Sequence, residues 1–230
     1  MARGGAERRA GGLVTRHGVL GGTFDPVHVG HLDVARAARE ALALDDVSLM
    51  PSNVPPHRGQ PHASATDRLA MVALAVGGRP GLVASSLELD ASGPSYTSAT
   101  LDRLATRGVD LRTVFFITGA DAFKDITMWK DFPQLLDRCH FVAVSRPDCP
   151  APGLRTALPA LAPRMVNAPG AMPSSPAIFL VDAPTAPVSS TTIRQRLAEG
   201  QPIEGLVPPA VAAYIHSHGL YRSRQHDERT

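Results

Sequence analysis

Two histidines stand three positions apart where a short apolar run gives way to an amphipathic segment. Residues 18–40 read GVLGGTFDPVHVGHLDVARAARE, with His28 and His31 near the centre. On the first turn of a helix these residues share one face, so both imidazoles can donate hydrogen bonds to phosphate oxygens. Gly21 and Gly22 have no Cβ and let a phosphate approach the main chain, while the amino end of the helix favours an anion. The residue types therefore predict a phosphate-binding site.

Two other interpretations of the histidines stay open at this point. They could simply cap the helix that follows, or they could ligate zinc together with a third residue that folding brings in. The chain lacks G-x-x-x-x-G-K-[ST], and it lacks G-x-G-x-x-G after this strand, so neither the P-loop nor the dinucleotide fingerprint is present. The histidines would then take the place of the P-loop lysine.

A second group of polar residues opens a helix near the end of the chain. The segment 188–197 reads VSSTTIRQRL, in which Ser189, Ser190 and Thr191 can cap the helix and bind phosphate oxygens. Arg194 lies one turn further along and can place its two-pronged guanidinium on a triphosphate. A lone S-S-T most often only caps a helix, so this interpretation depends on a partner elsewhere in the chain.

The elements that must position these residues are apolar strands that alternate with amphipathic helices. We expect strands at residues 16–21, 46–52, 81–89, 111–119, 140–146 and 177–182. We expect helices at residues 31–44, 64–76, 95–108, 189–200 and 208–219, with Ser64 and Asp67 as a capping box and Gly108 as a C-cap. This order predicts a doubly wound α/β fold, Rossmann-like, with a mostly parallel sheet and helices on both faces.

The 230 residues fit a single large domain. We expect a flexible extension at 1–15, one domain at 16–222 with a helical part from about 190, and a frayed tail at 223–230. The Pro-rich stretch 147–176 is expected to be a loop that carries one short helix at 154–162. In an open parallel sheet, ligands bind beyond the carboxyl ends of the strands at a topological switch point, which is where the first histidine stretch would lie.

Charge and composition limit the classes of partner that the protein is expected to bind. The net charge is +2 and no Lys/Arg run stands out, so we expect no nucleic acid and a small substrate. No apolar stretch approaches the roughly 20 residues of a membrane span, so we expect no membrane. The two cysteines form no C-x-x-C pair, which suits a reducing cytoplasm. The sequence leaves the oligomeric state open, and a homo-oligomer is compatible with it.

The motifs resemble those of a known superfamily. GGTFDPVHVGHL and SSTTIR are similar to the H-x-G-H and S-S-T-x-I-R signatures of the nucleotidylyltransferases, although class I aminoacyl-tRNA synthetases also carry H-x-G-H. Four further segments resemble the bacterial nicotinate-nucleotide adenylyltransferases, and the resemblance runs from about residue 16 to residue 222. They are PSNVPPHR (51–58), PSYTSATL (94–101), FITGADAFKDITMW (116–129) and VSRP (144–147).

The resemblance implies transfer of the AMP moiety of ATP to nicotinate mononucleotide, which yields deamido-NAD and pyrophosphate. It implies catalytic roles for His28, His31 and Arg194. ATP would be bound by Gly21, Gly22, Thr23, Phe24, Ser190, Thr191, Gly119 and Asp121, of which Asp121 would bind a ribose hydroxyl or cap a helix. The acceptor would be bound by Thr97, Trp129 and Arg58, although many family members have Lys in place of Arg58. Mg²⁺ would be coordinated by the ATP phosphates, and no dedicated group of carboxylates would bind a metal.

Three rival functions are weighed against this one. Phosphopantetheine adenylyltransferase shares the first motif and a version of the last, but the S-Y-T element and the Trp after G-x-D do not suit it. A nucleotide-binding sensor without chemistry would have lost a catalytic residue, whereas His28, His31 and Arg194 are all present. A zinc hydrolase is the third rival.

Overall fold

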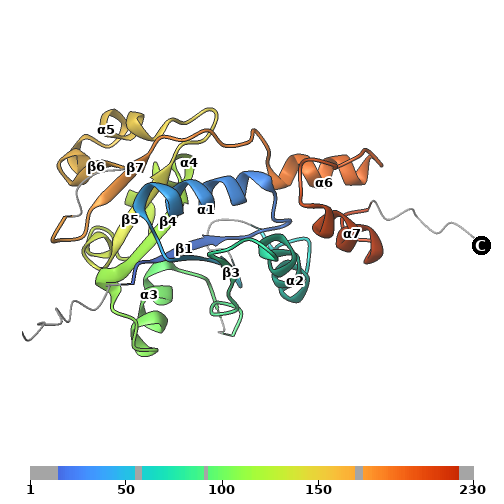
Figure 1. Ribbon diagram of the computed structural model, residues 1–230, viewed down its shortest axis with the longest axis horizontal. Helices are drawn as coiled ribbons and strands as arrows, with labels where there is room; N and C mark the ends of the chain where they lie inside the picture. The colour runs from blue at the N-terminus through green and yellow to red at the C-terminus, as the bar shows by residue number, and fades with distance from the viewer. Residues whose placement is uncertain (1–14, 55–58, 91–92, 169–172, 223–230) are drawn as a thin grey trace, which may run out of the picture.

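Parallel strands form the centre of the computed structural model, which describes residues 15–54, 59–90, 93–168 and 173–222 (Figure 1). Within these residues the sheet has seven strands in the order β3-β2-β1-β4-β5-β7-β6, and all neighbours run parallel. Their bounds are β1 His17–Gly22, β2 Asp46–Pro51, β3 Leu82–Ala84, β4 Val114–Gly119, β5 His140–Val144, β6 Met165–Ala168 and β7 Ile178–Val181.

Helices cover both faces of this sheet. The α-helices are α1 Val29–Leu42, α2 Ala65–Val76, α3 Thr97–Thr106, α4 Ala120–Phe123, α5 Leu154–Ala157, α6 Ser190–Ala198 and α7 Pro209–Ser217. Short 3₁₀ helices are η1 Leu111–Thr113, η2 Ile126–Met128, η3 Gln134–Asp137, η4 Ala151–Gly153 and η5 Pro159–Arg164. One buried cluster joins the sheet to α1, α2, α6 and α7, and a second joins it to α3, α4 and α5. No helix in the described part of the chain is long and apolar enough to cross a membrane.

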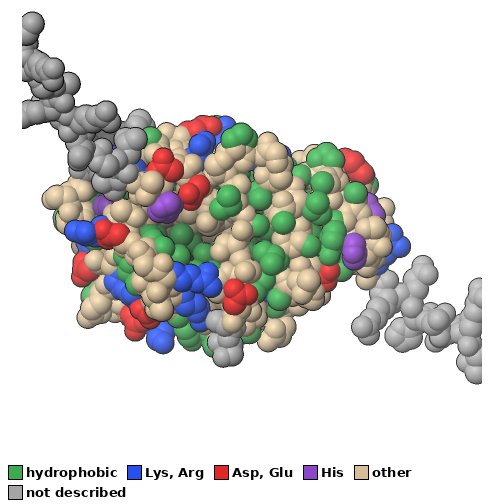
Figure 2. All heavy atoms as spheres, turned by 60° about the horizontal axis from the view of Figure 1, so that its bottom comes forward, with side chains coloured by type: hydrophobic (Ala, Val, Ile, Leu, Met, Phe, Trp, Pro, Cys, Tyr) green, Lys and Arg blue, Asp and Glu red, His purple; other side chains and the backbone are tan. Residues whose placement is uncertain are grey.

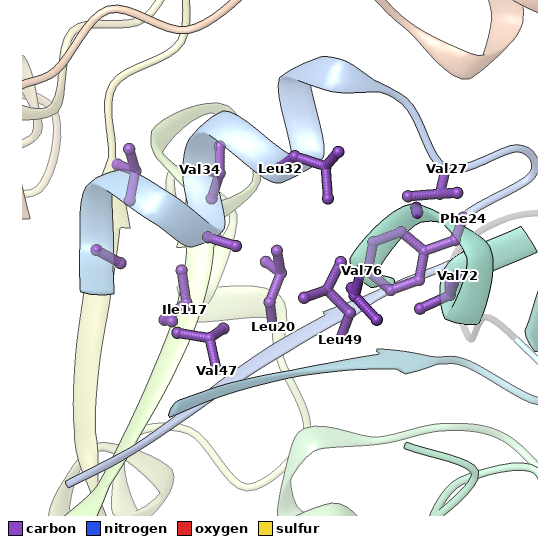
Figure 3. Close-up of a cluster of buried hydrophobic side chains, with 14 of the residues drawn as sticks. Leu20, Phe24, Val27, Leu32, Val34, Val47, Leu49, Val72, Val76 and Ile117 are labelled. Atoms are coloured by element: carbon purple, nitrogen blue, oxygen red, sulfur yellow. The ribbon is translucent and has the colours of Figure 1, made fainter. Parts of the chain in front are cut away.

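The central strands bury both of their faces. In β4, Val114 and Phe116 belong to one cluster, while Phe115 and Ile117 belong to the other. This alternation follows from the two-residue period of a strand, and it explains why β4 reads as an uninterrupted apolar run. Figure 3 shows the first cluster between α1, α2 and the strands that they cover. The predicted doubly wound α/β class is confirmed.

The topological switch point lies between β1 and β4. From β1 the chain adds β2 and then β3 on one side, and it returns to place β4 on the other side of β1. In folds of this class the loops beyond two such strands leave in opposite directions, and ligands bind between them at the carboxyl ends. The first histidine stretch follows β1, as expected.

The helix termini follow the predicted capping chemistry. The hydroxyl oxygen of Ser64 accepts the Asp67 N–H at 3.1 Å and so caps α2, as the capping box predicted. Gly108 lies just beyond α3 at φ +82°, a left-handed conformation that glycine adopts without the steric cost of a Cβ. Helix α1 begins at Val29, two residues before the prediction, because His28 is its N-cap.

Three expectations about elements were wrong in detail. The strand expected at 81–89 is confined to β3, because the chain turns at Ser86, whose carbonyl accepts the Leu89 N–H at 2.8 Å. The start of the strand expected at 111–119 is η1, which the Asp110 carboxylate caps. The stretch 147–176 contains the strand β6 besides short helices, and the single helix expected at 154–162 is divided between α5 and η5. The predicted extension at 1–15 and tail at 223–230 lie outside the described residues, apart from residue 15.

Candidate phosphate-binding site at the amino ends of α1 and α6

The two signature histidines form a stacked pair at the start of α1. His28 is the N-cap residue, and its N–H donates to Nδ1 of His31 at 3.2 Å. The two rings stack with centroids 3.6 Å apart, and the Phe24 ring meets His31 edge-on at 4.9 Å. The capping interpretation is thus correct for His31, but it does not exclude phosphate binding. A neutral His31 that accepts at Nδ1 carries its proton on Nε2 and can donate there.

His28 is held as a neutral imidazole. It is buried, and burial lowers its pKa to about 3, with a further lowering from the Arg146 guanidinium and an opposing effect of the Asp33 carboxylate. Its Nδ1 atom is buried and has no hydrogen-bond partner among the described residues. A buried nitrogen without a partner is uncommon in folded proteins and is typical of functional sites.

Gly22, at the end of β1, makes room for the Phe24 ring. A Cβ on Gly22 would lie 3.0 Å from the Phe24 ring, closer than ordinary van der Waals contact. Phe24 is buried in the core and its backbone has φ 49°, so its predicted ATP contact could come only from its main chain. The requirement for Gly22 is therefore steric as well as a matter of main-chain access.

The second motif is docked directly on the first. Ser189 caps α6 by accepting the Thr192 N–H at 3.1 Å, which confirms the capping prediction for Ser189 alone, since Ser190 and Thr191 lie within the helix. The Ser190 hydroxyl donates to the carbonyl oxygen of Pro26 at 2.9 Å. Figure 1 shows α6 beginning beside the end of α1 at which the chain arrives from β1. The two predicted phosphate-binding segments, about 160 residues apart in sequence, therefore meet.

Arg194 completes this junction. Its Nη1 donates to the main-chain oxygen of Asp25 at 2.7 Å, and its Nη2 donates to the Thr191 hydroxyl at 3.3 Å. These contacts fix the guanidinium at the amino end of α6 before any ligand arrives. Fixed donors of this kind need little reorganisation when an anion binds.

The buried Asp25 carboxylate accepts several hydrogen bonds, and the sequence analysis assigned it no role. It accepts the His62 N–H at 2.7 Å, the Ala63 N–H at 3.0 Å and the Tyr221 hydroxyl at 2.7 Å. Burial, together with the nearby Asp25 charge, raises the pKa of Tyr221. Asp25 belongs to the first motif, and this position could have marked it as a functional residue. Its hydrogen-bond partners could not have been predicted, because they lie far away in the sequence.

A second missed residue is the buried Arg68 of α2. Its Nη1 donates to the carbonyl oxygens of Thr23 at 2.9 Å and Ser52 at 2.7 Å, which ties the end of β1 to the end of β2. Arg68 lies three and four residues before the buried Met71 and Val72. An arginine on the apolar stripe of a helix is an unusual pattern, and it could have marked this residue.

Arg146 follows β5 and links the two motifs from the other side. Its Nη2 donates to the Val188 carbonyl oxygen at 3.1 Å, and its Nη1 lies 3.5 Å from the carbonyl oxygen of Gly30. A Cβ on Gly119 would meet the aliphatic stem of Arg146 at 3.2 Å. The family resemblance includes the segment VSRP (144–147), but the sequence analysis assigned no role to its arginine, Arg146.

The end of β4 carries the other residues predicted for ATP. Gly119 is the N-cap of α4, so the alternative that Asp121 caps this helix is wrong. Asp121 lies inside the first turn of α4 and is exposed. The predicted contact of its carboxylate with a ribose hydroxyl stays a prediction.

Two of the residues predicted for the acceptor, Thr97 and Trp129, follow β3 and β4 in the chain. Thr97 opens α3, and half-buried Trp129 meets the β4 residue Phe116 edge-on at 6.2 Å. Lys130 Nζ lies 4.9 Å from the centre of the Tyr96 ring, so the chain neighbours of Thr97 and Trp129 are in contact. Arg58 lies outside the described residues, and its predicted role remains untested.

The donor set of the site suits anions better than metal or covalent chemistry. No group of three or more His, Cys, Asp or Glu residues that could hold a metal ion occurs among the described residues, so the zinc interpretation finds no third ligand there. Both cysteines are buried, and burial raises the pKa of the Cys139 thiol to about 12, which keeps it protonated at neutral pH. Imidazole, hydroxyl and guanidinium donors remain, and these groups bind phosphate.

Comparison with known proteins agrees with this geometry. Residues 19–196 match the family model described as Cytidylyltransferase-like. A protein of Pseudomonas fluorescens named "Probable nicotinate-nucleotide adenylyltransferase" is 45% identical over 213 residues, covering 90% of this chain and 98% of the relative. A Roseiflexus protein of the same name is 42% identical over 208 residues, covering 89% and 97%.

Solved structures show the same fold at lower identity. A Plasmodium falciparum nicotinic acid mononucleotide adenylyltransferase, solved in complex with NaAD, superposes with a TM-score of 0.69. It is 16% identical in sequence, and the match covers 90% of this chain and 97% of that one. At this identity the likeness establishes the architecture.

Proposed function

The chain belongs to the nicotinate-nucleotide adenylyltransferase family, and we propose that it transfers the AMP moiety of ATP to nicotinate mononucleotide, with deamido-NAD and pyrophosphate as products. The observation that carries this proposal is the junction of the two motifs. Arg194 of the second motif donates to the main-chain oxygen of Asp25 in the first, which makes one anion site from both. The near-complete coverage of the bacterial relatives supports the choice of substrates.

The reaction is a displacement at phosphorus. An oxygen of the 5′-phosphate of nicotinate mononucleotide attacks the α-phosphorus of ATP, and the bond from that phosphorus to the β-phosphate oxygen breaks. The nucleophile belongs to the substrate and is anionic at neutral pH, so no side chain has to be activated. The protein contributes orientation and stabilisation of the developing charge.

The stacked histidines contact the α- and β-phosphates. His31 donates from Nε2, and neutral His28 donates one further hydrogen bond. Arg194, Ser190 and Thr191 stabilise the negative charge that grows on the departing pyrophosphate. Mg²⁺ enters with ATP as part of the substrate. The site offers guanidinium and imidazole groups rather than free carboxylates, and Mg²⁺ prefers carboxylate and phosphate oxygens as ligands.

The other predicted residues complete the proposal. Gly21, Gly22, Thr23 and Phe24 border ATP through their main chains, while Gly119 and Asp121 receive its ribose. Thr97, Trp129 and Arg58 bind the acceptor, with the Trp129 ring against the nicotinate. The two buried free thiols suit a reducing compartment, and we place the reaction in the cytoplasm.

Comparing acceptors tests this function. The purified protein is incubated with ATP and with nicotinate mononucleotide, nicotinamide mononucleotide or phosphopantetheine, and pyrophosphate release and product mass are followed. We expect the highest kcat/KM with nicotinate mononucleotide and a product with the mass of deamido-NAD. A higher kcat/KM with phosphopantetheine would overturn the proposed acceptor, and the absence of pyrophosphate with every acceptor would indicate a binding protein without this chemistry.

A further inference from the structure

Glu88 is a buried acid to which the proposed reaction gives no part. It lies in the turn after β3 and is only 5% exposed. Its Oε1 is 2.6 Å from the Thr100 hydroxyl oxygen in α3, and its carboxyl group also hydrogen-bonds the Ser95 side chain. Buried carboxyl groups are rare without a specific arrangement of partners, so this arrangement requires an explanation.

Burial and hydrogen bonding act in opposite directions on the pKa of Glu88. The Thr100 hydroxyl oxygen lies 2.6 Å from Glu88 and 3.2 Å from the carbonyl oxygen of Tyr96. The Thr100 hydroxyl has a single hydrogen, which it donates to Oε1 of Glu88 or to the Tyr96 carbonyl oxygen, and both bonds can form together when Glu88 carries a proton. Burial raises the pKa of Glu88 and favours that neutral form, while the hydrogen bonds from Thr100 and Ser95 and the Arg103 charge oppose this effect.

Ser95 connects Glu88 to the segment that follows β2. Its hydroxyl oxygen accepts the Asn53 N–H at 2.8 Å, and its own N–H donates to the Val54 carbonyl oxygen at 2.9 Å. A β-bridge between Val54 and Pro94 continues this contact. Glu88 therefore fixes residues 52–54 through Ser95 and the first turn of α3 through Thr100.

We propose that Glu88 is a positioning residue that holds the segments 52–54 and 95–97 together and thereby shapes the acceptor side of the site. This inference rests on the proposed function, because the acceptor is the ligand that these segments would border. In its neutral form, which burial favours, the carboxyl group adds no negative charge beside an acceptor that carries both a carboxylate and a phosphate. It can still make two directional hydrogen bonds, which a hydrophobic residue could not.

Glutamine mimics the neutral acid, and this gives the sharpest test. In Glu88→Gln the amide oxygen can accept from Ser95 while the NH₂ donates to Thr100, so every bond of the protonated acid is kept. We expect Glu88→Gln to retain KM for nicotinate mononucleotide within about twofold. Glu88→Ala leaves the two hydroxyls without this partner and should raise that KM about tenfold, with KM for ATP unchanged.

Two further variants separate positioning from general stability. Ser95→Ala removes the link to Asn53 without emptying the Glu88 pocket, and it should raise KM for nicotinate mononucleotide as Glu88→Ala does. Ser86→Ala is the matched control, because Ser86 lies in the same turn and its hydroxyl bonds Asp90 instead, at 3.2 Å. We expect this control to behave as wild type.

The readouts are steady-state kinetics, calorimetric binding of nicotinate mononucleotide without ATP, and thermal unfolding. The proposal is overturned if Glu88→Gln is as impaired as Glu88→Ala, or if Glu88→Ala and Ser95→Ala raise both KM values equally. It is also overturned if both of these variants keep wild-type affinity for the acceptor. A wild-type protein that makes no deamido-NAD would instead refute the proposed function, which the acceptor comparison detects independently.

Discussion

At the scale of single residues, the contrast between the two stacked histidines is informative. His28 is buried and its pKa is lowered to about 3, while His31 uses Nδ1 to accept the main-chain N–H of His28. A protonated His28 would place a charge beside Arg146 in a buried setting. In the proposed reaction, positive charge would therefore come from guanidinium groups and the helix terminus, and the imidazoles would act as oriented hydrogen-bond donors.

The buried His28 predicts a pH dependence of stability. Its folded pKa of about 3 lies below the usual 6.5, so the unfolded chain binds the proton more readily between these values. Its effect is therefore absent above about pH 6.5, and it destabilises the fold increasingly as the pH falls below that value. We expect His28 to remove roughly 2 kcal/mol of unfolding free energy between about pH 7 and pH 5.

Urea unfolding at the two pH values measures this loss. His28→Asn has no group that titrates in this range, so its stability should fall less with acidification than that of wild type. His17→Asn is the control, because His17 lies at the opposite end of β1 with a side chain 37% exposed. An equal acid sensitivity of wild type and His28→Asn would show that His28 does not carry the effect.

Trp129 is expected to act on the acceptor alone. Its ring is half-buried against Phe116, which leaves part of it available for stacking. Trp129→Ala should raise KM for nicotinate mononucleotide by about tenfold, and Trp129→Phe should keep most of the affinity because an aromatic face remains. Substrate-dependent kinetics at fixed ATP provide the measurement. A loss of ATP affinity with acceptor affinity intact would mean that Trp129 has been assigned to the wrong substrate.

At the scale of elements, the site is a junction between the amino ends of α1 and α6. Ser190 joins α6 to the carbonyl oxygen of Pro26, and Arg146 reaches from the end of β5 to the segments before α6 and within α1. The relative position of the two helix ends therefore depends on the Ser190 side chain of α6 and on the Arg146 side chain, which comes from outside both helices. Ligand affinity should consequently respond to residues that never touch a phosphate.

Arg146→Met tests this dependence. Methionine keeps much of the apolar stem beside Gly119 but loses the donors to Val188 and Gly30. We expect a loss of about 1–3 kcal/mol in unfolding free energy and a larger rise in KM for ATP than for the acceptor. Arg155→Met is the control, since Arg155 of α5 bonds Ala162 of η5 and Asn167 of β6 and touches neither motif. Equal effects of the two variants on KM for ATP would contradict the role of Arg146.

Elements with strong periodicity could be predicted from the sequence, and those without it could not. Helix α2 followed from its cap at Ser64, and β4 followed from its apolar run. Strand β6 has four residues and follows η5, which contains Pro163, so the local pattern suggested a loop. It becomes a strand because its register against β7 is available in three dimensions.

The site itself could be predicted only as far as its motifs extend. His28, His31 and Arg194 belong to short patterns with a chemical reason for each residue type, and the structure brings Arg194 to Asp25, in the loop that precedes the stacked histidines. Their supports, such as Asp25 and its partner Tyr221, are 196 positions apart, and no local pattern connects such residues. The fold brings such residues together, and their separation in the sequence follows no fixed spacing that a motif could show.

At the scale of the whole molecule, the strand order makes the site possible. Because β4 returns to the side of β1 opposite β2, the loops after β1 and β4 diverge, and α6 can dock at the resulting crevice. Figure 2 shows that the face carrying α2 and α3 has basic, acidic and apolar side chains interspersed. The net charge of the whole chain is only +2, so the proposed recognition of phosphates relies on local hydrogen-bond donors.

The most direct test of adenylyl transfer by this site is the turnover of His31→Gln. Glutamine at this position of the first helical turn can still accept the His28 N–H, so α1 keeps its cap while the imidazole is lost. We predict that kcat for deamido-NAD formation falls by about 10²–10³ while the melting temperature stays within a few degrees, with His17→Gln unchanged in both. Near-wild-type turnover by a folded His31→Gln protein would contradict the account.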